Sequence, residues 1–454
     1  MSRPSKRART RKQAAAARSA ASAKPPLAKP AAASAKKPAQ SLWARLGPGL
    51  ITGAADDDPS GIATYSQVGA GFGYSILWTA LLTFPLMVGI QTVSARIGRV
   101  TGHGLAANIR HYYPRPVLYG VVLLLLLANT INIAADIGAM GAALELLIGG
   151  NAHWYGAAFG VLSAVLQVFI PFRRYAPILK ALTLALLAYV ASLFIIEIPW
   201  GEVAVGTLLP RLSLKPEYIV AVVAVFGTTI SPYLFFWQAS QEVEEQRAAR
   251  GEKPLVEAPE QARAALKRIK LDTYIGMAFS NLVAFCIMLT AVTTLHLHGI
   301  TDIQSSSQAA QALRPIAGDF AFLLFSAGII GTGLLAVPVL AGSAAYGIAE
   351  AFRWRNGLGL DLAKARGFYG IIILATVLGI CLNFTPIDPI KALFWSAVIN
   401  GVVAVPVMII MMLMARKKEI MGAFVVKRRV LVLGWAATAV MAVMVAAMFA
   451  TWGR

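Results

Sequence analysis

The sequence is poor in cysteine, histidine and charged residues. Among its 454 residues are two cysteines, Cys286 and Cys381, and only 14% of the residues are charged. Each cysteine lies in an apolar run without a second Cys or His at metal-ligand spacing, which excludes a disulfide framework and a zinc site. The five histidines all lie between apolar runs or at their ends. The middle of those runs therefore lacks an imidazole that exchanges a proton near neutral pH.

Apolar residues make up 57% of the chain, and the mean hydropathy is strongly positive. They form about eleven runs, each near the roughly 20 residues that a helix needs to cross a hydrocarbon core about 30 Å thick. The runs are 46–69, 74–95, 117–148, 155–171, 178–198, 217–240, 271–296, 318–350, 368–384, 389–414 and 429–451. Residues 121–127 are apolar on every face, and the alternation typical of a barrel is absent. The sequence predicts an all-α integral membrane protein with about 11 transmembrane helices.

Acidic residues are also scarce, with 21 Asp and Glu against 41 Lys and Arg. Residues 1–45 hold 12 of the 41 and no acidic residue. We interpret residues 1–41 as a disordered basic tail that lies against anionic lipid, and we expect no nucleic-acid partner. Of the other 29 basic residues, 24 follow the second, fourth, sixth, eighth and tenth runs. The positive-inside rule then predicts a multi-pass protein of the cell (inner) membrane, with a cytoplasmic N-terminus and the C-terminus outside.

Two of the predicted spans contain a polar, proline-bearing break near the point where the bilayer midplane should fall. The first, residues 53–61, reads GAADDDPSG and carries Asp56, Asp57 and Asp58. The second, residues 227–233, reads GTTISPY. Proline unwinds a helix and leaves carbonyl oxygens free, and free carbonyls in lipid cost several kcal/mol each. We expect the two breaks to face each other at an ion site; ordinary proline kinks are the alternative interpretation.

The breaks lie about 170 residues apart, which is what two inverted five-helix repeats would give. We expect a transport domain at 42–454, with repeat one at 46–198, repeat two at 217–414 and an extra helix at 429–451. An organic-solute symporter and a membrane-embedded enzyme are alternatives. Three consecutive aspartates favour a cation over an organic solute. The sequence lacks a His-Glu-x-x-His motif and a nucleophile elbow, so we expect that the protein is not an enzyme.

Several motifs resemble the natural resistance-associated macrophage protein (Nramp) family of divalent metal transporters. They are Gly47-Pro-Gly-Leu50, Asp58-Pro-Ser-Gly61, Phe72-Gly-Tyr74, Ser94-Ala-Arg-Ile-Gly98 with Thr101-Gly102, Ala134-Ala-Asp136 and Gly227-Thr-Thr-Ile-Ser-Pro232. The resemblance implies a fold of the leucine-transporter type, with helices 1 and 6 broken at the substrate site. It covers nearly the whole chain from about residue 42, weakly in the later helices.

The chain departs from the family pattern at three positions. The family's first break reads Asp-Pro-Gly-Asn, and its sixth helix carries Met-Pro-His. Here Asp58 keeps the aspartate, but Gly61 stands for the asparagine, Ser231 for the methionine and Tyr233 for the histidine. This combination resembles the Nramp-related magnesium transporters, a branch of the family. The resemblance implies that Asp58, the Thr228 carbonyl and Ser231 contact the ion.

Ligand chemistry supports this branch independently of the resemblance. A thioether is a soft ligand that favours transition metals, whereas hydroxyl, carbonyl and carboxylate oxygens suit Mg²⁺. Mg²⁺ usually keeps several waters, so its site should be roomy. Gly61 provides room, and Asp57 or Asp56 would hold the retained waters. We therefore expect import of Mg²⁺ and also Mn²⁺ as transported substrates, with no cofactor and no obligatory protein partner.

Other polar residues in the spans have less certain roles. Asp136 matches an aspartate tied to proton movement in the family, but Ala139 replaces the glutamate expected three residues later, so a hydrogen-bonded structural role is equally open. Asn400 is expected to form an interhelical hydrogen bond. Gln238, one turn beyond Tyr233, remains ambiguous. Without a histidine at 233 and an acid at 139, we expect transport without proton coupling; a proton-coupled Mn²⁺ or Fe²⁺ transporter is the alternative.

Overall fold

The computed structural model describes residues 52–53, 55–171, 174, 177, 181 and 184–452, and the elements formed within these ranges are all helical. The first half contains α4 (Pro59–Phe72), α5 (Trp78–Thr101), α6 (Leu105–Tyr112), α7 (Arg115–Ile148), α8 (Ala152–Phe169), α10 (Leu187–Ser192) and α11 (Trp200–Leu208). The second half contains α12 (Pro216–Thr229), α13 (Pro232–Ala248), α14 (Ala262–Thr294), α15 (Ser306–Gln311), α16 (Arg314–Ala317), α17 (Ala321–Ala351), α18 (Arg366–Asn383), α19 (Pro389–Arg416), α20 (Lys418–Met421) and α21 (Arg428–Thr451). The all-α prediction is confirmed for this part of the chain. The predicted tail, 1–41, lies outside it.

Nine stretches of helix in the described ranges are long and apolar enough to cross a membrane. Nine of the eleven predicted spans correspond to them, including the extra helix predicted at 429–451, which is α21. The other two are 46–69 and 178–198. Span 46–69 is interrupted at residues 57–58, and 46–51 and 54 lie outside the described residues. Span 178–198 is only partly described, at 181 and from 184 onward. The chain is a multi-pass membrane protein.

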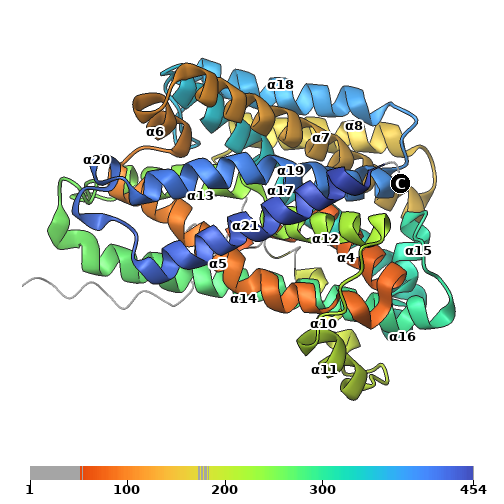
Figure 1. Cartoon of the computed structure of the whole chain (residues 1–454). Helices are drawn as coiled ribbons and strands as arrows, with labels where there is room; N and C mark the ends of the chain where they lie inside the picture. The colour runs from red at the N-terminus through yellow and green to blue at the C-terminus, as the bar shows by residue number, and fades with distance from the viewer. Residues whose placement is uncertain are drawn as a thin grey trace, which may run out of the picture. The chain divides into compact units, whose positions relative to one another are not determined.

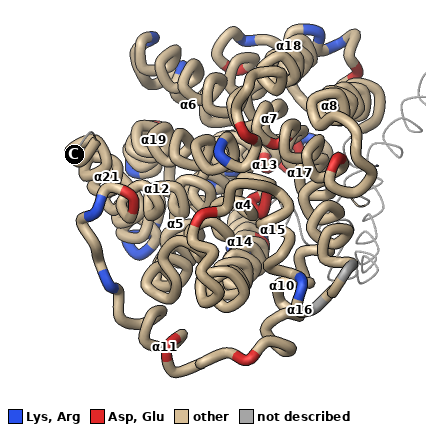
Figure 2. Tube along the Cα trace, turned by 90° about the vertical axis from the view of Figure 1, so that its right-hand side faces the viewer, with Lys and Arg blue, Asp and Glu red and all other residues tan. Residues whose placement is uncertain are grey.

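Helix α4 lies at the centre of the helix bundle, surrounded by longer helices (Figures 1 and 2). It packs against α12, α14 and α19, while α7 packs against α8, α17, α18 and α19. Helix α21 packs on α5 and α19. Figure 1 shows α6 and α20 at one end of the bundle and α11, α15 and α16 toward the other. Segments from both halves of the chain therefore surround the first break.

Glycine lets helices approach so closely that their backbones touch around the second break. A Cβ added at Gly227 of α12 would lie 2.0 Å from the Ala397 carbonyl oxygen and 2.5 Å from the Gly401 nitrogen of α19. Close contact through small residues is the usual way that helices pack in lipid, where no hydrophobic force drives them together. The contact fixes α12 against α19 one turn before the helix breaks.

We predict that Gly227→Ala separates α12 from α19 and lowers the free energy of unfolding by about 1–3 kcal/mol, because the backbone atoms it meets cannot move aside. The matched control is Gly120→Ala on an exposed face of α7, where an added Cβ has no atom within 4 Å. That control should be neutral or stabilising by up to about 1 kcal/mol. Apparent melting temperatures of the purified proteins compare the two. Equal melting temperatures would contradict the assigned contact.

Candidate metal site

The first break is built around Asp58, which caps α4. Residues 55–56 are helical, Asp57 leaves the helix, and Asp58 adopts an extended backbone with φ −69° and ψ 171°. Its carboxylate Oδ1 accepts hydrogen bonds from the Gly61 amide (2.7 Å) and the Ser60 hydroxyl (2.7 Å). Pro59, at the first position of α4, has no amide proton that would need a partner. The Asp-Pro-Ser-Gly sequence thus ends one half-helix and starts the next.

The second oxygen of Asp58 is held by residues from two other helices. Its Oδ2 accepts from the Asn132 side-chain amide of α7 (3.0 Å) and from the Tyr233 hydroxyl of α13 (3.4 Å). The Asp58 side chain is 1% exposed. A buried carboxylate is tolerated only when it is paired or hydrogen-bonded. Donors from α4, α7 and α13 therefore hold the Asp58 carboxyl group together.

The second break separates α12 from α13 at Ile230 and Ser231. Ser231 has an extended backbone, with φ −80° and ψ 136°, and Pro232 starts α13. The Ser231 hydroxyl donates to the carbonyl oxygens of Gly227 (2.7 Å) and Thr228 (2.8 Å). The serine thus partly satisfies the carbonyl groups freed by the break, including the Thr228 carbonyl predicted to contact the ion.

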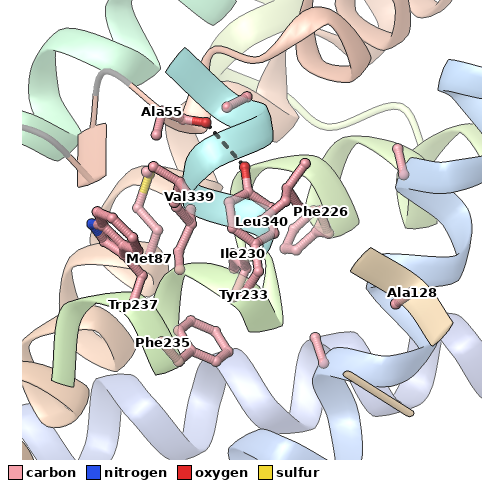
Figure 3. Packing of buried hydrophobic residues seen from close by; sticks show 14 of the residues in the cluster. Ala55, Met87, Ala128, Phe226, Ile230, Tyr233, Phe235, Trp237, Val339 and Leu340 are labelled. Atoms are coloured by element: carbon pink, nitrogen blue, oxygen red, sulfur yellow. Dashed lines mark hydrogen bonds between the residues drawn. The ribbon is translucent and has the colours of Figure 1, made fainter. Parts of the chain in front are cut away.

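The two breaks meet, as the sequence predicts. The Tyr233 hydroxyl donates to the Ala55 carbonyl oxygen (3.0 Å), and Figure 3 shows this bond among the packed side chains of both segments. On the α4 side, the Tyr65 hydroxyl lies 3.0 Å from the Thr229 hydroxyl. The Ser60 and Thr228 hydroxyls lie 3.5 Å apart. Polar groups of both half-helix pairs thus surround Asp58.

Asp56 and Asp57 have a different partner from Asp58. The Ser280 hydroxyl of α14 lies 2.5 Å from Asp56 Oδ2 and 3.2 Å from Asp57 Oδ1. Among the residues that the structure describes, Asp56 Oδ1 and Asp57 Oδ2 have no hydrogen-bond partner. Within the described residues, no three Asp, Glu, His or Cys side chains are arranged to hold a metal ion. An ion at Asp58 would therefore be bound mostly by neutral oxygen atoms and water.

Two predicted polar residues are buried without a partner. Neither carboxylate oxygen of Asp136 in α7 accepts a hydrogen bond, so the hydrogen-bonded structural role considered for it does not fit the described residues. The interhelical hydrogen bond expected of Asn400 is not formed within the described residues, because neither its amide nitrogen nor its oxygen has a partner there.

The remaining predicted residues lie on either side of Asp58. A Cβ added at Gly61 would lie 3.3 Å from the Asp56 carbonyl oxygen and 3.4 Å from the Thr228 hydroxyl, so Gly61 packs closely between the two breaks and does not provide the room expected of it. Gln238 accepts from the Thr52 hydroxyl (2.5 Å), and its amide donates to Glu242 (3.4 Å). It therefore links the segment before the first break to α13.

Three residues of this network were not identified from the sequence. Asn132 lies one turn before Asp136 on the same face of a mostly apolar helix, so their spacing could have indicated a shared site. Tyr65 and Ser280 gave no signal, because single tyrosines and serines are common in membrane helices and a serine can bond to its own helix. Their roles depend on which helices α4 and α14 contact.

Comparison with known proteins identifies relatives along nearly the whole chain. A family described as "Natural resistance-associated macrophage protein-like" matches residues 49–451. The protein named divalent metal cation transporter MntH of Klebsiella pneumoniae is 26% identical over 404 residues, which cover 87% of this chain and 91% of that protein. Its namesake from Pectobacterium carotovorum is 28% identical over 300 residues, or 65% of this chain and 69% of that protein. These relatives are named as transporters, not enzymes, in agreement with the sequence prediction.

Solved structures share the fold at low sequence identity. The Eremococcus coleocola manganese transporter, in a mutant form, has a TM-score of 0.68 at 18% identity, covering 90% of this chain and 87% of that one. The nucleobase-cation-symport-1 family transporter Mhp1, in a closed conformation, has a TM-score of 0.54 at 12% identity, covering 90% and 92%. The predicted leucine-transporter-type fold is confirmed by this likeness.

Asp58 both caps α4 and supplies an ionisable carboxyl group, and two different substitutions distinguish these roles. We predict that Asp58→Ala lowers the free energy of unfolding by about 0.5–2 kcal/mol through loss of the cap, whereas Asp58→Asn keeps an acceptor for the Gly61 amide and costs less. Apparent melting temperatures of the purified variants measure the difference. If Asp58→Ala melts at or above the temperature of Asp58→Asn, the capping role is wrong.

Proposed function

This chain belongs to the natural resistance-associated macrophage protein family, and from that premise we propose that it imports Mg²⁺, and also Mn²⁺, across the cell membrane through a site between the two helix breaks. The observation that carries the proposal is the set of groups around Asp58. Asn132, Ser60, Tyr233 and Thr228 offer amide, hydroxyl and carbonyl groups, and no thioether, thiolate or imidazole stands at either break. Such oxygen-rich surroundings suit a hard cation.

The predicted ligands would contribute to ion binding in different ways. Asp58 would supply the negative charge, and the Thr228 carbonyl would turn toward the ion when its bond with Ser231 lengthens. Asp56 and Asp57 each keep one carboxylate oxygen without a partner, and these oxygens would accept hydrogen bonds from waters retained by the ion. Mg²⁺ is usually held by one or two carboxylates and several waters, which matches one direct carboxylate and two more distant ones.

A second candidate function is proton-coupled transport of Mn²⁺. Two observations favour it: the likeness to the Eremococcus coleocola manganese transporter and the buried Asp136, whose two oxygens have no partner. A carboxylate in this state binds a proton or a cation readily, because burial disfavours its isolated charge. The two candidates differ in ion preference and in proton movement, and both can be measured in the same vesicles.

Metal flux into proteoliposomes tests the main proposal. We expect uptake of Mg²⁺ and Mn²⁺ by the wild-type protein, reported by an ion-sensitive dye inside the vesicles, and loss of both fluxes in Asp58→Asn, which keeps the cap of α4 but removes the charge. A wild-type protein that carries Mn²⁺ but no Mg²⁺ would overturn the magnesium assignment. Full flux in Asp58→Asn would remove the proposed site itself.

The same vesicles test proton coupling. A membrane potential of about 100 mV contributes roughly 4.6 kcal/mol to the entry of a divalent ion, equivalent to about three decades of concentration ratio. The potential alone is therefore sufficient to drive uptake, and we expect the signal of a pH-sensitive dye inside the vesicles to stay constant during Mg²⁺ entry. Acidification in fixed proportion to the metal taken up would favour the second candidate.

Selectivity should depend on Ser231 and Gly61. We predict that Ser231→Met with Gly61→Asn lowers the ratio of Mg²⁺ to Cd²⁺ flux, because the larger side chains exclude water and the thioether binds soft metals. Ser231→Ala is the matched control, since it removes the hydroxyl without adding sulfur or bulk, and it should lower the ratio much less. An unchanged ratio in the double variant would show that these positions do not set selectivity.

A further inference from the structure

A separate cavity of about 420 Å³ lies where α6, α13 and α17 meet the segment that follows α17. Four arginines contribute to its lining: Arg110 of α6, Arg247 of α13, and Arg353 and Arg355 after α17. All four belong to segments predicted to face the cytoplasm. On α13, Ser240, Val243 and Arg247 line the cavity. Two other residues of α13 contact other elements: Gln238 contacts Thr52 before the first break, and Glu242 contacts α14. The cavity is therefore distinct from the site at Asp58.

The two carboxylates that also line the cavity are already bound by other groups. Glu350 accepts from the Ala107 amide (3.1 Å) and the Ser240 hydroxyl (3.2 Å). Glu244 accepts from the Tyr346 hydroxyl and from the Leu358 amide (2.7 Å). In the described part of the chain, no salt bridge joins either glutamate to an arginine of the cavity. Arg110 donates to the Glu350 backbone carbonyl, and the guanidinium groups retain further donors for a ligand.

The backbone at Arg353 gives a second, independent indication of a ligand. Helix α17 ends in a motif in which the Phe352 amide bonds to the Ile348 carbonyl (3.0 Å) and the Trp354 amide to the Ala349 carbonyl (2.8 Å). Arg353 has φ +60°, the left-handed conformation that glycine normally supplies at this position. Among the described residues, no other non-glycine residue has a positive φ. An arginine in this conformation lowers the stability of the folded protein by about 1 kcal/mol relative to glycine, which suggests that its side chain has a function.

We propose that this cavity binds the phosphate group of an anionic ligand. Guanidinium groups bind phosphate through two parallel hydrogen bonds, and four arginines line this cavity beside two carboxylates that already accept hydrogen bonds from other groups. The positive-inside rule explains basic residues near span ends, but it explains neither their convergence in one cavity nor a left-handed arginine. The phosphate belongs either to a lipid headgroup or to a soluble phosphate compound.

A neighbouring cavity of about 430 Å³ makes the lipid source structurally reasonable. It shares Glu244, Arg247, Asn356 and Leu360 with the arginine-lined cavity, and its other lining residues include Pro171 and Leu358. A headgroup phosphate in the first cavity would place the glycerol and upper chain of a lipid near this less polar surface. In either case the bound phosphate would join Arg247 of α13 to Arg353 and stabilise α13 against α17.

The test compares binding by the full-length wild-type protein with binding by Arg353→Gly/Arg355→Gln. Glycine suits the left-handed backbone, so this variant should fold with unchanged or higher thermal stability. The matched control is Arg428→Gln/Arg429→Gln, which removes two exposed arginines at the start of α21, within a segment predicted to be cytoplasmic. In one arm, native mass spectrometry measures retention of phosphatidylglycerol against phosphatidylcholine. In the other, inorganic phosphate and ATP without metal are tested for a rise in melting temperature.

We expect the wild-type protein and the control to bind the phosphate ligand about tenfold more strongly than Arg353→Gly/Arg355→Gln, because the variant loses charge-assisted hydrogen bonds. The stronger binding would be seen as retention of phosphatidylglycerol or as stabilisation by the soluble phosphates. Binding only in the lipid arm assigns a headgroup, and binding only in the soluble arm assigns a free phosphate. Equal binding by a folded Arg353→Gly/Arg355→Gln and the control, or no binding in either arm, overturns the proposal. Neither arm depends on which metal the protein transports.

Discussion

The arrangement of the core depends on burying the carboxyl group of Asp58 inside a protein surrounded by lipid. A carboxylate in this position must be stabilised by several donors, and no continuous helix can supply them, because its amides bond to its own carbonyls. The interruption of the helix before Pro59 exposes the Gly61 amide at the start of α4, where the helix dipole also favours negative charge. The remaining donors come from Asn132 and Tyr233, so α7 and α13 must approach α4.

Polar contacts between side chains close the site on both sides of Asp58. Toward one side, Tyr65 contacts Thr229, and Gln67 bonds to Asp302 (3.1 Å) and to the Ile303 amide (2.9 Å). Toward the other, Thr52 bonds to Gln238, and Arg268 bonds to Glu242 (2.5 Å). A neutral hydrogen bond contributes about 1 kcal/mol and one to a charged group about 1.5–3 kcal/mol, so the Arg268–Glu242 pair is the strongest of these contacts.

The sequence predicts those features that a single residue forces on the backbone. Pro59 and Pro232 cannot continue a helix, and three aspartates in an apolar span need a polar environment, so the breaks and their meeting were predictable. The contacts of individual side chains were not. Ser280 bonds to two aspartates only because α14 packs on the first break, and Asn400 has no hydrogen-bond partner among the described residues. Such outcomes depend on helix rotation, which hydrophobicity in lipid constrains weakly. The metal ligands themselves remain predictions.

The position of the Ser231 hydroxyl changes how its effect on ion preference should be understood. It donates to the Gly227 and Thr228 carbonyl oxygens, so in the proposed site serine at 231 would act on the ion partly by controlling those carbonyls. A methionine there has no hydroxyl proton, so it would leave both carbonyls without this donor while adding a soft sulfur atom. Free carbonyl oxygens are acceptable to Mg²⁺ and do not by themselves discriminate against it. In the proposed Mg²⁺ site, discrimination would therefore come from the sulfur and from the volume it takes from water, and serine would preserve Mg²⁺ binding chiefly by leaving that volume to the ion's own hydration shell.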